Sequence, residues 1–155
     1  MTSTAFYQDT HCVPLQANQE TAALSSSAMV AIRETQPKWL RDSLRKLQEL
    51  ATLQENWDSY GASPVNANSV VRAQELVCYL ARFVGVDEPA VGATPEGHVG
   101  FSWDEGAWSL DAEVLPNGRI AYVYLDERDS ANDRETTTRR WADLLALLTQ
   151  LPEST

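Results

Sequence analysis

The chain has 155 residues, of which 43% are hydrophobic and 22% are charged. It can therefore bury the core of one ordinary domain, and its overall composition is neither that of a wholly disordered chain nor that of a coiled coil. The 22 acidic residues outnumber the 12 basic ones, for a formal net charge of −10. This excess argues against broad electrostatic binding to nucleic acid or to anionic membranes, which requires clustered basic residues.

Residues 1–35 are rich in Thr, Ser, Gln, Asn and Ala and carry few charges. We expect a flexible N-terminal tail there, a single domain over residues 36–151, and a short C-terminal tail over 152–155. The first residues lack the basic and apolar pattern of a signal peptide, so we expect a cytoplasmic protein. His11 and Cys12 are adjacent without further ligands nearby, and we expect neither a metal centre nor a cofactor.

Two helices are predicted in the first half of the domain. Pro37 is suited to a first helical turn, and Leu40, Leu44 and Leu47 then recur at helical spacing. A second helix is expected to start at Ser63-Pro64 and to end at Gly85. Its predicted buried stripe consists of Val70, Ala73, Val77, Leu80 and Val84. The short link between the two helices favours an antiparallel pair.

Between Pro89 and Glu127 the hydrophobic period changes from 3.6 to 2. Turn signals divide this stretch into four predicted strands, at 90–94, 98–103, 108–115 and 119–126. A last helix is expected over 134–149, with Asp133 as its N-cap. The predicted fold class is α+β: a helical hairpin, a four-stranded antiparallel meander and a C-terminal helix, with the helices on one face of the sheet.

The turns also predict which side chains share a face. We place a two-residue turn at Asn117-Gly118, a four-residue loop at 104–107 and a three-residue turn at 95–97. The resulting inner face contains Val91, Val99, Phe101, Trp103, Trp108, Leu110, Ala112, Val114, Ala121, Val123 and Leu125. The predicted outer face, left open to solvent or to a partner, contains His98, Asp111, Glu113, Tyr122, Tyr124 and Asp126.

The acidic excess is concentrated in the sheet and the last helix. Residues 1–85 contain 8 acidic and 7 basic residues, whereas residues 86–155 contain 14 acidic and 5 basic ones. Charge beside tyrosines on an open sheet face is typical of a surface that docks a basic partner. Our leading hypothesis is therefore a non-enzymatic protein-binding module, such as an inhibitor, an antitoxin-like or immunity-like protein, or a regulatory subunit.

Three other functional interpretations of the sequence remain open. A small enzyme or ligand-binding domain would use the same face, with Asp111 and Glu113 two residues apart on one strand and His98 as a general base. DNA contact through the first helix would use Lys38, Arg41, Arg45 and Lys46, although no helix-turn-helix pattern follows. Self-association through an exposed edge strand is the third.

The link between the helices, residues 56–64, carries a distinctive motif. We expect Trp57 and Tyr60 to close the end of the core, Asn56 and Asp58 to bond freed backbone groups, and Gly61 to adopt a left-handed conformation. Pro64 would restart the chain as helix. Under the leading hypothesis we predict no catalytic residues and no metal-binding residues in the chain.

This element resembles the Asn-Trp-Asp-x-Tyr-Gly-Ala-x-Pro element of a group of small bacterial proteins. In that group it follows a Leu-rich helix and precedes a Pro-Thr-x-x-Gly turn and a Trp-containing strand. Here the later features look like the segment 93–97, in altered order, and Phe101-Ser102-Trp103. The resemblance covers roughly residues 40–125 and implies no particular activity.

Overall fold

The computed structural model describes residues 30–150; the expected C-terminal tail and most of the expected N-terminal tail lie outside this range. Within it, three α-helices accompany one five-stranded antiparallel sheet, so the α+β class is confirmed. The helices are α3 (Trp39–Leu50), α4 (Ala67–Leu80) and α5 (Trp141–Leu148). The strands are β1 (Ala90–Ala93), β2 (Val99–Asp104), β3 (Trp108–Val114), β4 (Ile120–Asp126) and β5 (Arg134–Thr138), with a short 3₁₀ turn, η1 (Ser130–Asn132), before β5.

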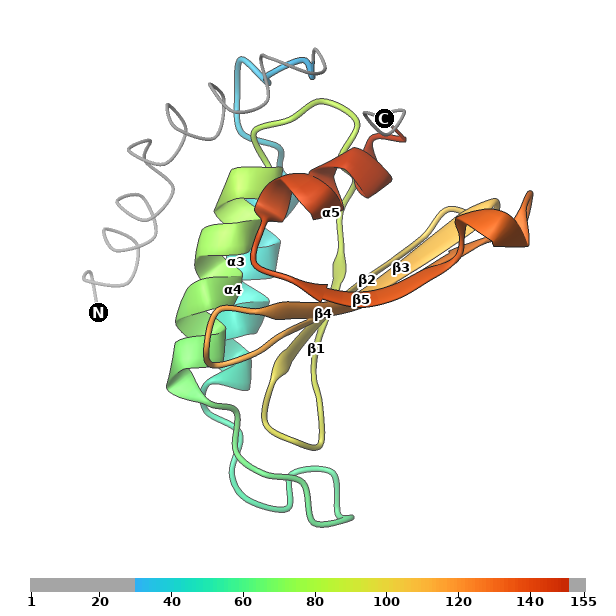
Figure 1. Cartoon of the computed structure of the whole chain (residues 1–155). Helices are drawn as coiled ribbons and strands as arrows, with labels where there is room; N and C mark the ends of the chain where they lie inside the picture. The colour runs from blue at the N-terminus through green and yellow to red at the C-terminus, as the bar shows by residue number, and fades with distance from the viewer. Residues whose placement is uncertain (1–29, 151–155) are drawn as a thin grey trace.

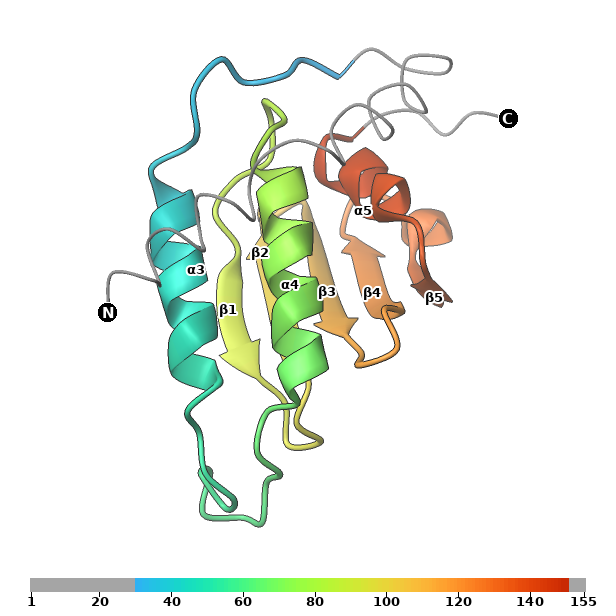
Figure 2. The same ribbon diagram turned by 90° about the vertical axis from the view of Figure 1, so that its left-hand side faces the viewer.

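The helices and the sheet form two layers. Figure 2 shows α3, α4 and α5 in front of the sheet, with the strands running from β1 to β5 in sequence order. Figure 1 shows the same arrangement from the side, with α4 in front of α3 and the sheet twisting away from them. The three helices therefore leave the opposite face of the sheet uncovered among the described residues.

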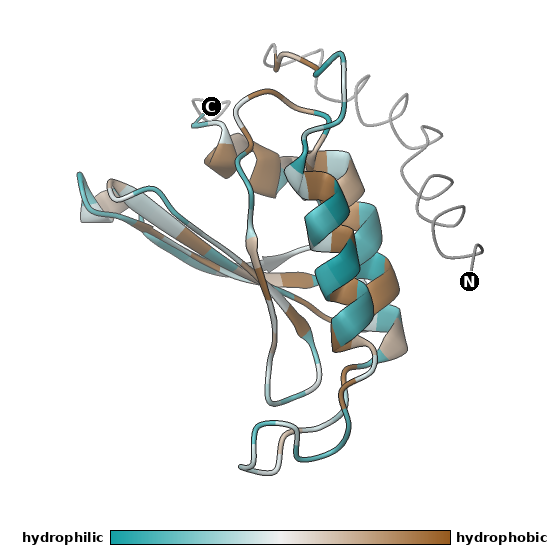
Figure 3. Ribbon diagram, turned by 180° about the vertical axis from the view of Figure 1, so that it is seen from behind, coloured by the Kyte–Doolittle hydropathy of each residue, from teal (hydrophilic) through white to brown (hydrophobic). Residues whose placement is uncertain are grey.

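The core lies between these layers. Leu47, Leu76, Phe101, Leu110 and Leu144 each come from a different element and are almost completely buried. The helix α5 is hydrophobic along nearly its whole length, whereas α3 turns hydrophilic residues outward (Figure 3). The short α5 therefore owes its position to burial of its leucines rather than to helix propensity.

The first helix agrees with its prediction, but the second is shorter than expected at both ends. The helix α4 begins at Ala67, because Asn66 rather than Ser63 caps it by accepting a hydrogen bond from the Asn68 N–H. It ends at Leu80, so Val84 lies beyond the helix and is 52% exposed instead of buried.

The chain after α4 pairs with residues from the expected N-terminal tail. Ile32 forms an antiparallel bridge with Phe83, and the Val84 N–H donates to the Ala31 carbonyl. The Arg33 guanidinium donates to the carbonyls of Phe83 and Val86. Residues 30–33 are thus attached to the domain at the point where α4 ends.

The prediction for β4 was wrong in register. The β3–β4 pairs are Val114 with Ile120 and Leu110 with Tyr124, because the loop has three residues, not two. The Leu115 N–H donates to the Arg119 carbonyl, and Gly118 takes a left-handed φ of 85°. A tight turn that ends in a glycine with positive φ is a common form of the three-residue hairpin loop. A slip of one residue exchanges the two faces of β4.

The other two hairpins keep the predicted faces. The β1–β2 pairing of Val91 with Phe101 is confirmed, with Gly97 at φ 86° in the turn. In the β2–β3 hairpin Trp103 pairs with Leu110, two residues away from the predicted partner Trp108. A shift of two residues preserves the inside–outside alternation, so the core side chains of β2 and β3 are as predicted.

The segment predicted as one long last helix contains a fifth strand. Arg134–Thr138 pairs with β4, and α5 starts only at Trp141. The run Thr136-Thr137-Thr138 explains the difference, because β-branched residues favour strands over helices.

The linker motif forms a loop held by its own side chains. Asn56 Oδ1 accepts from the Gly61 N–H, and Asp58 Oδ1 accepts from the N–H groups of Tyr60 and Ala62, as expected. Gly61 has the predicted left-handed φ, at 89°. Tyr60, however, is 93% exposed and closes no part of the core, because the loop projects beyond the ends of the helices (Figure 1).

Past the loop, the linker docks on the β1–β2 turn. The Ser63 N–H donates to the Pro95 carbonyl, and the Asn66 N–H donates to the Gly97 carbonyl. Pro64 lies in this extended stretch and does not begin the helix, contrary to the prediction. A Cβ at Gly97 would lie 2.5 Å from the Pro64 carbonyl oxygen, so only glycine permits this contact.

Candidate functional site

The uncovered face of the sheet is hollowed into a groove of about 840 Å³. Its floor consists of small residues on β1, β2 and β4, among them Gly92, Gly100, Ser102 and Ala121. A twisted sheet whose side chains are this short leaves the strand backbones within reach of a bound molecule. The groove therefore follows from the alternation of side chains along these strands. The bulky residues face the core, and the small residues between them face the groove.

The charged side chains that rise into the groove are acidic. Asp111 and Glu113 project from β3, and Glu135 projects from β5. Asp111 and Glu135 both pair with Val123 on the strand between them, which puts their Cα atoms roughly 9–10 Å apart by strand geometry. No residue lining the groove in the described part of the chain is a lysine or an arginine. The lining thus carries three carboxylates without an internal positive charge.

One end of the groove is organised by His98. The His98 Nδ1 lies 2.5 Å from Glu113 Oε1, and Thr94 Oγ1 donates to the same oxygen over 3.3 Å. The Thr94 Oγ1 in turn accepts from the His98 N–H. The side chains of His98 and Glu113 are 23% and 34% exposed, so the pair is half-buried but reachable from solvent. Glu113 is therefore held in place, whereas Asp111 has a freer, exposed carboxylate.

Tyr122, Tyr124 and Asp126 lie on the other side of the sheet, although we had predicted them on the open face. All three are at most 7% exposed and point toward the helices. Tyr124 packs against Trp108 at a ring-centroid separation of 5.9 Å and shares a hydrogen bond with Gln150. The one-residue register difference in β4 is the cause. Of the six predicted partner-binding residues, Asp111 and Glu113 line the groove, and His98 contacts Glu113 beside it.

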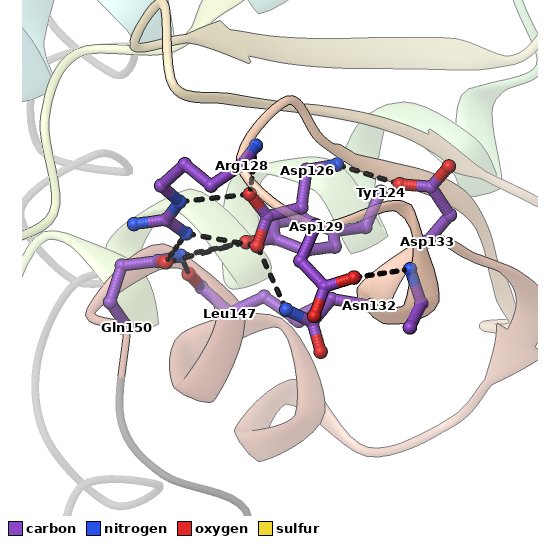
Figure 4. A network of polar contacts seen from close by, with 9 residues as sticks. Tyr124, Asp126, Arg128, Asp129, Asn132, Asp133, Leu147 and Gln150 are labelled. Carbon is purple, nitrogen blue, oxygen red and sulfur yellow. Dashed lines mark hydrogen bonds and ion pairs between the residues drawn. The ribbon is translucent and has the colours of Figure 1, made fainter.

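Asp126 organises a polar network at the end of β4 (Figure 4). Its carboxylate accepts from the Arg128 guanidinium through both oxygens and also from the Asn132 side chain. The Asp126 N–H donates to Asp133, and Arg128 extends the network to Gln150 after α5. The Arg128 guanidinium and the other donors hold the pKa of Asp126 well below its usual range. This carboxylate therefore fixes the turn between β4 and β5.

Sequence reasoning missed Glu135, Thr137 and Ala121 as groove residues. The signal that could have found Ala121 is Pro116. A two-residue turn at Asn117-Gly118 would need an N–H at position 116 to pair with Arg119, and proline has none. The three-residue loop avoids that requirement and turns Ala121 and Val123 toward the groove.

Within residues 30–150, no group of three or more His, Cys, Asp or Glu side chains is arranged to hold a metal ion. No helix in that range combines the length and apolar character needed to cross a bilayer. Comparison of the chain with protein-family models, with curated proteins and with solved structures finds no match in any of the three.

Proposed function

We propose that the protein is a binding module whose open sheet face receives a basic partner. One observation carries the proposal: a groove lined by Asp111, Glu113 and Glu135 contains no lysine or arginine among its described lining residues. Unbalanced carboxylates in a concave surface attract and orient positive charge. The role that fits such a surface is that of an inhibitor, an immunity-like or antitoxin-like protein, or a regulatory subunit.

The shape of the groove supports an extended or helical segment of a protein as the occupant. The small side chains at Gly92, Gly100 and Ser102 keep the β1–β2 part of the groove low, and the carboxylates rise beside it from β3 and β5. Lysine or arginine side chains from a docked segment would reach Asp111 and Glu135 while its backbone lies over the floor. Bidentate arginine–carboxylate contacts would add geometric specificity.

Fluorescence anisotropy with a labelled oligoarginine peptide tests the proposal directly. We expect the double variant Asp111→Lys, Glu113→Lys to raise the Kd by at least about tenfold, because it reverses the charge of the two β3 carboxylates in the groove. Raising the salt concentration should weaken binding to the unmodified chain by screening the same charges.

A charge-matched control separates the groove from the net charge. Glu55 and Glu88 are exposed and lie outside the groove. The variant Glu55→Lys, Glu88→Lys changes the net charge equally, and we expect less than about a threefold change in Kd because long-range charge is screened. Equal losses for the two variants would refute the groove as the binding site. Circular dichroism would verify that both variants are folded.

A small-ligand or enzymatic role of the same face is the second candidate. It is favoured by the concavity of the groove and by the contact between His98 and Glu113, in which a carboxylate orients an imidazole. Native mass spectrometry with arginine, spermidine and choline distinguishes the two candidates. A stoichiometric complex that Glu113→Gln abolishes would favour the small-ligand role, and no complex would favour a macromolecular partner.

A further inference from the structure

The strand β5 has an open outer edge. It is the last strand of the sheet, and no described residue pairs with its outer side. Figure 2 shows no element beyond it, whereas α3 lies alongside β1 at the opposite edge. The strand contains no proline and includes three consecutive threonines, so none of the usual obstacles to further strand pairing is present apart from charge.

The hydrogen-bond pattern shows which backbone groups face outward. The Leu115 N–H donates to Arg119, and the Glu127 N–H donates to Ala107, so the odd-numbered residues of β4 bond to β3. The even-numbered residues of β4 then bond to β5, where their partners are Arg134, Thr136 and Thr138. The N–H and C=O groups of Glu135 and Thr137 consequently point away from the sheet and have no strand partner among the described residues.

We infer that β5 pairs antiparallel with β5 of a second copy of this chain, in a register centred on Thr136. Glu135 of each copy then exchanges backbone hydrogen bonds with Thr137 of the other, and the two Thr136 residues form the close, non-hydrogen-bonded pair at the two-fold axis. Threonine–threonine pairs of this kind are favourable across strands.

The charges around β5 favour this register over its neighbours. Centring on Thr136 places Asp133 opposite Arg139 of the second copy, twice by symmetry. Centring on Glu135 would put that residue opposite itself, and centring on Thr137 would put Arg134 opposite Arg140. Like charges directly opposite each other destabilise a strand pair. The Thr136 register alone avoids both clashes.

The same pairing joins the two ends of opposite charge. The segment before β5 carries Glu127, Asp129 and Asp133, together with Arg128, which is paired with Asp126. The segment after β5 carries Arg139 and Arg140. An antiparallel arrangement sets each acidic end beside a basic end, which offsets part of the repulsion expected from the net charge of −10. A parallel arrangement would place the two acidic ends together and the two basic ends together.

The consequence for the groove is continuity across the pair. Glu135, Thr136 and Thr137 line the groove at its β5 side, so each copy would contribute residues at the junction of the two grooves. The surface offered to a partner would be one long acidic face over ten strands, from two five-stranded sheets. The pairing itself rests on the edge of β5 and not on the proposed function.

Sedimentation equilibrium of the full chain over about 1 µM to 1 mM tests the inference, since a strand–strand contact is a small interface of weak to moderate affinity. We expect a mass approaching twice that of one chain. Thr137→Pro removes the outward N–H and leaves the β4 contacts in place, so it should weaken association at least about tenfold. Thr137→Val keeps the N–H and should associate like the unmodified chain. A monomer at every concentration, or equal association of the two variants, would overturn the inference.

Disulfide trapping tests the register. Thr136→Cys would place two thiols across the axis, and we expect mild oxidation to yield a covalent dimer on a non-reducing gel. Arg134→Cys places its two thiols well apart along the strands and should yield none. Trapping through position 134 and not through 136 would contradict the Thr136 register.

Discussion

The two faces of β4 differ in a way that hydrophobicity alone does not explain. The face toward the helices carries Tyr122, Tyr124 and Asp126, and the face toward the groove carries Ala121 and Val123. The more polar set is thus the buried one. Its polar groups are satisfied inside the protein: Tyr124 shares a hydrogen bond with Gln150, and Asp126 is held by Arg128 and Asn132. The large tyrosine rings fill the core, and the small residues leave the groove open.

Among substitutions on the two faces of β4, the largest expected effect is on the free energy of unfolding. We expect Tyr124→Ala to lower the free energy of unfolding by about 3–4 kcal/mol, because it removes a buried ring. Val123→Ala, one residue along the strand but facing the groove, should cost less than about 1 kcal/mol. Urea denaturation measures both. A larger loss for the valine would mean that the two faces of β4 are exchanged.

The next largest effect distinguishes the buried carboxylate of Asp126 from the exposed carboxylate of Asp111. Asp126 has a depressed pKa, so its contribution to stability is present above the unfolded pKa of about 3.9 and is lost as the pH falls through the folded pKa. We expect Asp126→Asn to lower the Tm by more than about 5 °C at pH 7 and to flatten the loss of stability in acid.

The matched change in the groove, Asp111→Asn, should leave the Tm within about 2 °C, because the Asp111 side chain is exposed. Thermal melts from pH 2 to pH 7 compare the two variants. The distinction between a structural and a binding carboxylate would fail if both variants showed the same acid profile.

The smallest effect is expected on the floor of the groove. A Cβ at Gly100 would make only ordinary contacts, the nearest at 3.8 Å, so Gly100→Ala should be neutral or stabilise by about 0.5 kcal/mol. Gly97→Ala adds strain at a positive φ and a clash with Pro64, and should destabilise by more than about 1 kcal/mol. Chemical denaturation of the two variants compares the open floor of the groove at Gly100 with the tight turn at Gly97.

Much of the fold could be predicted because its signals are local. The leucines of α3 recur at helical spacing, and Gly97 marks a turn whose register follows from loop length. The register of the β3–β4 hairpin could not be predicted from the apolar pattern. The odd-numbered and the even-numbered side chains of β4 are both suited to burial. The residues of the turn decide that register, because Pro116 lacks the N–H that a two-residue loop would need.

The site was predicted in part for the same reason. Asp111 and Glu113 lie on β3, whose alternation between large apolar and polar residues is unambiguous. Glu135 could not be placed, because β5 has no apolar face and its pairing with β4 is a long-range contact that threonine propensity only suggests. The network around Asp126 likewise depends on Gln150, which is distant in sequence.

The proposed binding of a basic partner to the acidic open face can be mapped residue by residue. Titration of oligoarginine into isotope-labelled protein, followed by amide NMR spectra, provides this map. We predict the largest shifts at groove residues such as Gly92, Gly100 and Val123, with little change at α3. Shifts concentrated on the outer helices, or spread evenly over the acidic surface, would contradict the account.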